Sequence, residues 1–270
     1  SYFIYRKKLN LKKFTIIKKK AIKEKYAHII YGSDEIWNFN NNLVGLDSFY
    51  FGDSCNQKKI AFSVSFGTVK ENQKQLPKIK KYLKKFSKIS VRDTHSSKIL
   101  NNIDIQNQLT LDPVFLYDFK DELSKINFKN QNKKYILIYG LISDKKIIEN
   151  IKLYKKDKNY EIISIGYYNR WVDKNIVYSI DPFLFLKIFK NSEKVFTSMF
   201  HGVILSLKFN KKFFIIKDNY RVNKLSYLTK KFKLKFLYNN QDYNLIRFKK
   251  QINIMNLVNK KNLLKDINSS

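Results

Sequence analysis

A histidine, His201, lies in the polar segment 197–202 between two apolar runs, 195–196 and 203–207. We interpret the first run as a buried strand and the second as a helix, so that the segment between them is a turn. The first backbone N–H groups of such a helix lack partners and, with the positive end of the helix dipole, attract an anion. At this position His201 can donate to a phosphate or carboxylate, or exchange a proton during catalysis. The alternative is that His201 only caps the helix and makes local hydrogen bonds.

An arginine, Arg92, follows a second predicted strand at residues 89–91. An arginine at the end of a strand can bind a carboxylate or a phosphate through two parallel hydrogen bonds. The alternative is a structural ion pair with Asp93 or Asp34. The sequence leaves both interpretations open.

Small and polar residues follow two further predicted strands. The carboxyl ends of strands form the ligand-binding edge of α/β proteins, so these residues are candidates for substrate binding. For the first of the two strands the alternative is an ordinary Asx turn or a helix cap. The candidates are Ser33 and Asp34 after the strand 27–31, and Ser65 and Gly67 at the end of the strand 59–65.

Apolar strands alternate with amphipathic helices along most of the chain, which predicts βαβ units and parallel sheets. In the first half we expect strands at 27–31, 49–51, 59–65, 89–91 and 109–116 (with a turn), and helices within 70–88 and 94–100. In the second half we expect strands at 135–139, 161–165, 195–197 and 213–216, and helices at 145–155, 182–190, 203–209 and 222–230.

The chain becomes polar and charged over residues 119–133, where we place a domain boundary. We therefore predict two Rossmann-like α/β domains, residues 1–125 and 126–270, that face a cleft. The lysine-rich residues 1–26 are expected to form one or two short surface helices, and residues 244–268 a further amphipathic helix.

The composition indicates a folded protein, because 270 residues with 44% hydrophobic content can bury one large or two ordinary cores. No apolar run approaches the roughly 18 residues that span a bilayer, and the first residues lack a signal-peptide pattern, so we expect a cytoplasmic protein. The single cysteine, Cys55, agrees with a reducing compartment. One cysteine and three scattered histidines give no zinc-ligand spacing.

The net charge of +32 would normally point to nucleic acid or another polyanion. Here the lysines are spread over the whole chain and no nucleic-acid motif accompanies them, so we expect no specific nucleic acid. Nonspecific attraction to polyanions and acidic lipid is expected and should weaken with salt.

Five segments resemble, in order, the motifs of the polysaccharide pyruvyl transferase family. Residues 32–38, GSDEIWN, resemble its GSD-x-[IV]-W-N signature, and residues 61–67 its strand ending in S-F-G. The other three are SVRD at 90–93, DPV at 112–114, and SMFHG at 198–202, after which Arg221 is placed like the family's arginine. The resemblance covers roughly residues 27–230.

This resemblance implies a GT-B-like fold and transfer of pyruvyl from phosphoenolpyruvate to two hydroxyls of a sugar, which forms a ketal and releases phosphate. It implies His201 as acid/base or phosphate ligand, Arg92 and Arg221 as anion clamps, and no metal or redox cofactor. Gly202 would support the phosphate, while Asp34 and Ser65 would orient the acceptor. Substrate-binding roles are implied for Arg92, Arg221, Gly202, Ser198, Ser65, Gly67, Asp34 and Ser33.

The implied partners are phosphoenolpyruvate and a saccharide of a cell-surface polysaccharide, with peripheral contact at the inner membrane face. Two alternatives stay open, a GT-B glycosyltransferase that uses a nucleotide sugar and a noncatalytic relative of the fold. Family members begin with a strand and a glycine-containing, Asn-rich loop, which we do not find before Ala27, so we expect an incomplete first domain. Lys212 replaces the family's proline after the histidine-containing helix.

Overall fold

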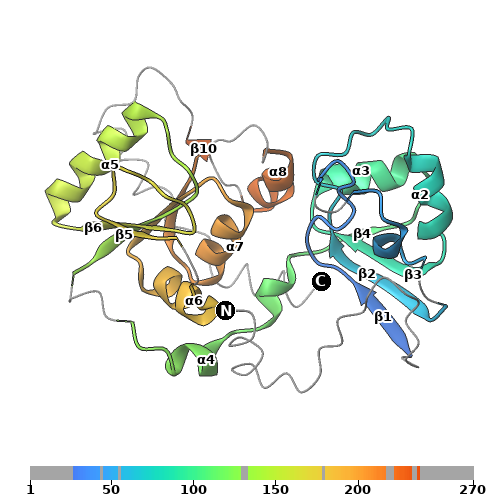
Figure 1. Cartoon of the computed structure of the whole chain (residues 1–270), viewed down its shortest axis with the longest axis horizontal. Helices are drawn as coiled ribbons and strands as arrows, with labels where there is room; N and C mark the ends of the chain where they lie inside the picture. Colours follow the sequence, from blue (N-terminus) through green and yellow to red (C-terminus); the bar gives the residue numbers. More distant parts are fainter. Residues whose placement is uncertain are drawn as a thin grey trace. The chain divides into compact units, whose positions relative to one another are not determined.

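The computed structural model describes residues 27–42, 45–53, 56–128, 133–177, 180–216, 222–232 and 236–237. The chain divides into two compact units (Figure 1). Among the described residues, the N-terminal unit comprises those of 27–113 together with Asn223–Lys230, and the C-terminal unit comprises those of 114–222 and 231–237. The helices predicted within 1–26 and 244–268 lie outside the described residues, as do Cys55 and Arg221.

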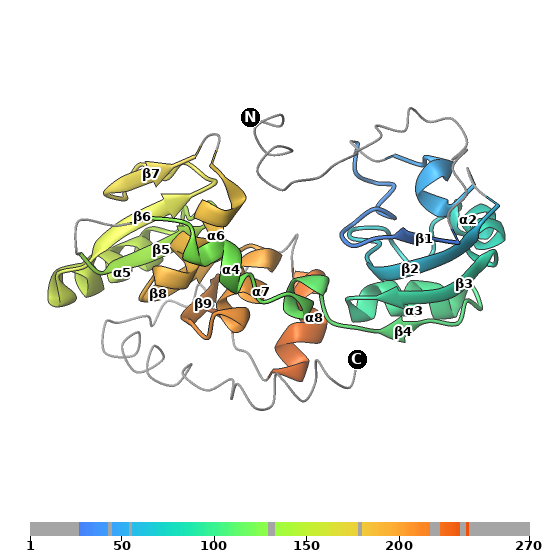
Figure 2. The same ribbon diagram turned by 90° about the horizontal axis from the view of Figure 1, so that it is seen from below.

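The N-terminal unit contains a parallel sheet in the order β1-β2-β3-β4. Its helices α2 and α3 connect or follow successive strands (Figures 1 and 2). Since all the strands run the same way, their carboxyl ends meet at one edge. The bounds are β1 His28–Tyr31, β2 Lys58–Val64, α2 Leu76–Leu83, β3 Phe86–Val91, α3 Thr94–Asn102 and β4 Gln108–Leu109. Most of α8 (Val222–Lys231) groups with this unit.

Residues 49–51 do not form the predicted strand. Ser48–Phe51 is a short 3-10 helix, η1, which begins after Asp47 and ends at Gly52. The Asp47 side chain accepts a hydrogen bond from the Phe49 N–H at 3.0 Å, so a local cap outweighs the strand preference of three aromatic residues.

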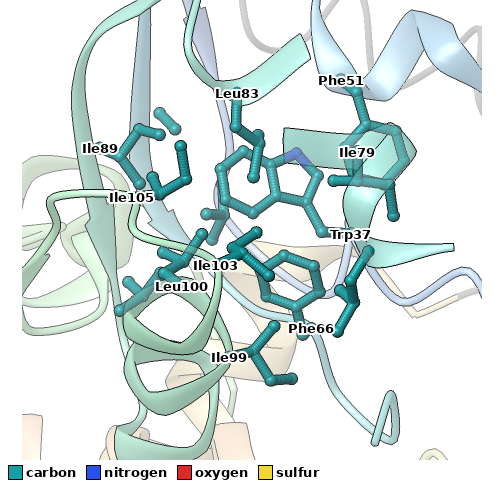
Figure 3. Packing of buried hydrophobic residues seen from close by; sticks show 14 of the residues in the cluster. Trp37, Phe51, Phe66, Ile79, Leu83, Ile89, Ile99, Leu100, Ile103 and Ile105 are labelled. Carbon is teal, nitrogen blue, oxygen red and sulfur yellow. The ribbon is translucent and has the colours of Figure 1, made fainter. Parts of the chain in front are cut away.

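Trp37 lies at the centre of the core of the N-terminal unit (Figure 3). Its side chain is fully buried and its indole N–H donates to the carbonyl of Tyr50 at 2.9 Å. The rings of Phe51 and Phe66 lie 6.0 and 5.3 Å from it. Apolar residues at helical spacing on α2 and α3 close the cluster, so the helices and the turns after β1 and β2 are fixed by one core.

The C-terminal unit contains a parallel sheet in the order β10-β9-β8-β5-β6-β7. The chain runs outward from β5 in one direction through β6 and β7, and in the other through β8, β9 and β10. The two directions separate between β5 and β8, which is the switch point where Rossmann-like sheets bind ligands. The elements are η2 Pro113–Leu116, α4 Lys120–Ser124, β5 Tyr135–Tyr139, α5 Lys145–Lys158, β6 Glu161–Ile165, β7 Lys174–Ile176, α6 Pro182–Asn191, β8 Lys194–Thr197, α7 Phe200–Lys208, β9 Lys212–Ile216 and β10 Phe236–Leu237.

Most predicted elements of this unit are confirmed, β5 and β6 with their predicted bounds. The short α4, β7 and β10 were not predicted, because segments this short carry no readable period. One difference matters for the site. Helix α7 begins at Phe200 and not at Val203, so His201 and Gly202 lie inside its first turn and not in the turn before it.

Candidate functional site

The predicted site residues of the N-terminal unit follow three neighbouring strands at the same sheet edge. Ser33 and Asp34 come after β1, Ser65 and Gly67 after β2, and Arg92 after β3. The parallel sheet therefore brings these segments together, as expected for a ligand-binding edge.

Arg92 is buried and bridges two carboxylates. Its Nη2 donates to Asp34 Oδ1 at 2.6 Å, and its Nη1 donates to Asp112 Oδ2 at 3.0 Å. The side chains of Arg92 and Asp112 are 3% and 2% exposed, whereas that of Asp34 is 62% exposed. The ion pair with Asp34 is one of the alternatives that the sequence left open. Asp93 instead caps α3, since its Oδ1 accepts from the Ser96 N–H at 2.7 Å.

Asp112 is a functional candidate that sequence reasoning missed, although the DPV segment contains it. It follows β4 and reaches Arg92 because a buried network holds the segment before it. Ser63, which has a φ of +52° at an irregularity of β2, contacts Thr110 Oγ1 at 2.9 Å and donates to the carbonyl of Leu111 at 2.8 Å. A bulge next to the ligand edge thus fixes the position of the Asp112 carboxylate.

The backbone of Asp34 is tied to the end of β2. Its carbonyl accepts from the Ser65 N–H at 2.9 Å, and it forms an isolated bridge with Val64. The Ser33 hydroxyl lies 3.4 Å from the carbonyl of Ser63. This pairing fixes where the Asp34 side chain leaves the backbone.

Ser65 and Gly67 shape the turn after β2. Ser65 is fully buried, and its Oγ accepts from the Gly67 N–H at 3.0 Å. Gly67 is buried with a φ of +57°, against the side chains of Asn38 and Glu35. In this conformation the Ser65 hydroxyl is not open to a ligand and Gly67 has no side chain, so contact with a substrate would fall to the backbone around them.

In the C-terminal unit, the first turn of α7 follows directly from β8. The Thr197 hydroxyl donates to the carbonyl of Tyr139 at 2.6 Å and accepts from the Met199 N–H at 3.0 Å. The first bond of the helix runs from the Val203 N–H to the carbonyl of Met199, so the N–H groups of residues 200–202 precede the helical ladder. His201 belongs to this first turn and is half-buried. Its ring lies edge-on to the Phe200 ring, with 5.4 Å between the two ring centroids.

Ser198 lies at the switch point of the sheet. It follows β8 directly, while Gly140 follows the neighbouring strand β5. A Cβ at Gly140 would come 2.5 Å from Ser198 Oγ, so the absence of a side chain there lets the two strand ends approach. The predicted residues Ser198, His201 and Gly202 are therefore brought to one place.

Position 202 requires a glycine because the first turn of α7 lies very close to the Thr197 side chain. A Cβ at this position would lie 2.0 Å from Thr197 Oγ1 and 2.7 Å from Thr197 Cβ, so the helix could not keep its place over the strand end. We expect Gly202→Ala to lower the free energy of unfolding by about 1–3 kcal/mol, which thermal and urea unfolding would measure.

The double variant Gly202→Ala with Thr197→Gly is the control for this clash, since glycine removes both the Oγ1 and the Cβ of residue 197. If overpacking is the cause, the double variant loses less stability than the sum of the two single variants. Additive losses would show that the Cβ is accommodated and that Gly202 has another role.

The two groups of predicted residues lie in different units, Arg92 in the N-terminal and His201 in the C-terminal one. Their predicted convergence on one cleft stays a prediction, and Arg221 lies outside the described residues.

A separate cavity of about 480 Å³ lies at the amino-terminal edge of β3 and β4. It is lined by residues such as Lys84, Lys88 and Asn107, and none of the predicted site residues lines it.

Within the described ranges, no group of three or more His, Cys, Asp or Glu side chains is arranged to hold a metal ion. None of the described helices is long and apolar enough to cross a membrane.

Solved structures show where this fold occurs. The chain is 12% identical to a putative UDP-N-acetylglucosamine 2-epimerase from Listeria monocytogenes, covering 90% of this chain and 69% of that one with a TM-score of 0.56. It is 13% identical to MnaA of S. aureus in complex with UDP, and the match covers 89% of this chain and 69% of that one with a TM-score of 0.52. These likenesses confirm the predicted α/β fold with parallel sheets, which resembles the GT-B enzymes.

Sequence comparison with curated proteins found no match. A family profile described as Polysaccharide pyruvyl transferase matches residues 1–220, which include every predicted site residue except Arg221. The chain therefore belongs to the polysaccharide pyruvyl transferase family, a family of transferases.

Proposed function

We propose that this protein transfers pyruvyl from phosphoenolpyruvate to two hydroxyls of a sugar in a cell-surface polysaccharide or its precursor. The observation that carries the proposal is the family match, which spans both the Arg92 and the His201 segments. In this reaction the two sugar oxygens bond to C2 of the donor, its bond to phosphate oxygen breaks, and the methylene carbon gains a proton. The products are a cyclic pyruvate ketal and inorganic phosphate.

The donor carries a phosphate and a carboxylate, so the reaction needs groups that bind anions. The first turn of α7 is suited to the phosphate, because the N–H groups of residues 200–202 precede the helical ladder and the helix dipole is positive there. Its place at the switch point between β5 and β8 supports this role. Arg92 and Arg221 are proposed to bind the donor's anionic groups as well.

The reaction also needs a proton donor for the methylene carbon and a base for the sugar hydroxyls. We assign the proton transfer to His201, which is half-buried at the start of α7. Asp34 has an exposed carboxylate at the edge of the other sheet and is assigned to the acceptor. The two sugar protons end on the methyl group and on the released phosphate.

Calorimetric titration with phosphoenolpyruvate at about 150 mM salt tests the donor site, because a specific site survives charge screening whereas attraction to a polycation does not. Saturable binding supports the proposal. Absence of binding together with saturable binding of UDP would overturn it in favour of a nucleotide-sugar enzyme. Absence of both would favour a noncatalytic relative.

Removal of the proton donor is expected to slow turnover by about 10²–10⁴-fold in His201→Ala, with less effect on binding of the donor. Phosphate release from phosphoenolpyruvate, measured with a panel of methyl glycosides as acceptors, is the assay. The matched control is His28→Ala, since His28 is an exposed residue of β1 outside the proposed site. Equal rates in the two variants would remove His201 from the chemistry.

A further inference from the structure

Arg92 holds two counter-ions that differ sharply in burial. Asp112, 2% exposed, is enclosed with the guanidinium, whereas Asp34, 62% exposed, covers it from the solvent side. With both carboxylates in place only 3% of the Arg92 side chain is exposed. An anionic ligand therefore cannot bind this guanidinium until one carboxylate leaves.

Asp34 is the carboxylate that can leave. Moving Asp112 away would leave two buried charges apart, which is far more costly than exposing a carboxylate that already faces water. The backbone of Asp34 is held by the Ser65 N–H at 2.9 Å and by the bridge to Val64. Asp34 Oδ1 also accepts a hydrogen bond from the Glu35 N–H at 2.8 Å. Rotation of the side chain exchanges this bond and the bond to Arg92 for bonds to water, and it opens the Nη2 edge of Arg92 without moving the backbone.

We propose that Asp34 is an exchangeable counter-ion of Arg92, which the anionic group of the donor displaces, while Asp112 is a positioning residue that keeps the guanidinium in place. This inference rests on the proposed function and deepens it. The exchange replaces one anion by another at the same guanidinium, so Arg92 never lacks a partner.

A competing counter-ion weakens ligand binding, so its removal must strengthen it. We expect Asp34→Asn to bind phosphoenolpyruvate about tenfold more tightly than the wild type, since the asparagine keeps the shape but no longer competes as an anion. In turnover the same variant is expected to show a lower KM for the donor together with a lower kcat. A residue that only holds the turn together would raise KM or leave it unchanged.

The experiment is calorimetric titration of the full chain with phosphoenolpyruvate, comparing the wild type, Asp34→Asn and Glu35→Gln. Glu35→Gln removes the same charge one residue away. The Glu35 carboxylate of the wild type accepts a hydrogen bond from Asn38 Nδ2 at 2.8 Å. Tighter binding in Asp34→Asn alone is the expected result. Equal or weaker binding in Asp34→Asn, or the same gain in both variants, would overturn the exchange.

A parallel titration with inorganic phosphate separates this inference from the proposed function. If no variant binds phosphoenolpyruvate but Asp34→Asn binds phosphate more tightly than the wild type, the exchange stands and the pyruvyl donor is wrong. If phosphoenolpyruvate binds to the wild type and Asp34→Asn gains nothing for either probe, the donor stands and the exchange is wrong. If neither probe binds to any variant, both are wrong.

Discussion

Asp112→Asn is expected to lower the free energy of unfolding by about 3–5 kcal/mol, because it leaves the buried Arg92 charge without its enclosed partner. Asp34→Asn removes a carboxylate from the same guanidinium and is expected to cost less than about 1 kcal/mol, because Asp34 is largely exposed. The bond to Asp34, at 2.6 Å, is shorter than the bond to Asp112, at 3.0 Å, so the expected difference in stability follows from burial and not from hydrogen-bond distance.

Urea unfolding followed by tryptophan fluorescence would measure both variants, since Trp37 reports on the core of the same unit. The double variant Asp112→Asn with Arg92→Met is the control. Removing both charges is expected to recover part of the stability that Asp112→Asn alone loses. Equal losses in Asp34→Asn and Asp112→Asn would contradict the distinction between an anchored and an exchangeable counter-ion.

Local sequence patterns predicted the longer strands of the C-terminal unit because each of them is a short apolar run between polar turns. The run 135–139 is buried on both faces of a parallel sheet and therefore reads as continuous apolar sequence. Parallel strands also explain why Asp34 and Arg92 could be placed at one edge from the sequence alone, although they lie far apart along the chain.

Tertiary contacts account for what the sequence did not reveal. Asp112 pairs with Arg92 only because β4 lies beside β3 and the Ser63 network fixes the segment after it. The start of α7 was placed too late because the apolar run begins at Val203, whereas the helix already turns at Phe200, whose side chain is buried. The need for Gly202 arises from Thr197, a contact that no helical pattern encodes.

Lys194 is a second buried charge with a large expected effect, in the C-terminal unit. It is the first residue of β8 and is 6% exposed, with its Nζ 5.0 Å from the ring centroid of Tyr154. Burial, followed by repulsion from Lys212 and Lys158 and opposed by Glu193, lowers the pKa of Lys194 from 10.5 to about 8. Below pH 8 Lys194 is therefore protonated in the folded protein, although burial disfavours its ammonium group.

The sign of the pH effect follows from the protons bound. Between about pH 8 and 10.5 the unfolded chain holds the Lys194 proton more strongly than the folded protein, so this group makes the free energy of unfolding rise with pH. Burial also raises the pKa of Tyr154 from 10.0 to about 12, which acts in the opposite direction above pH 10. The contribution of Lys194 is therefore measured between pH 7 and 10.

Lys194→Met is expected to raise the free energy of unfolding at pH 7 by about 1–2 kcal/mol. The lowered pKa corresponds to a penalty of about 3 kcal/mol, of which the contact with the Tyr154 ring offsets about 1–2 kcal/mol, and methionine keeps most of the buried volume. Urea unfolding at several pH values should show the gap between variant and wild type narrowing as the pH rises to 10. Lys212→Met, at an exposed lysine paired with Lys194 across the sheet, is the comparison. It removes only the repulsion, which lowers the pKa of Lys194 less than burial does, so it should raise stability by less than Lys194→Met. A gap that stays constant with pH would show that packing, and not the charge of Lys194, limits stability there.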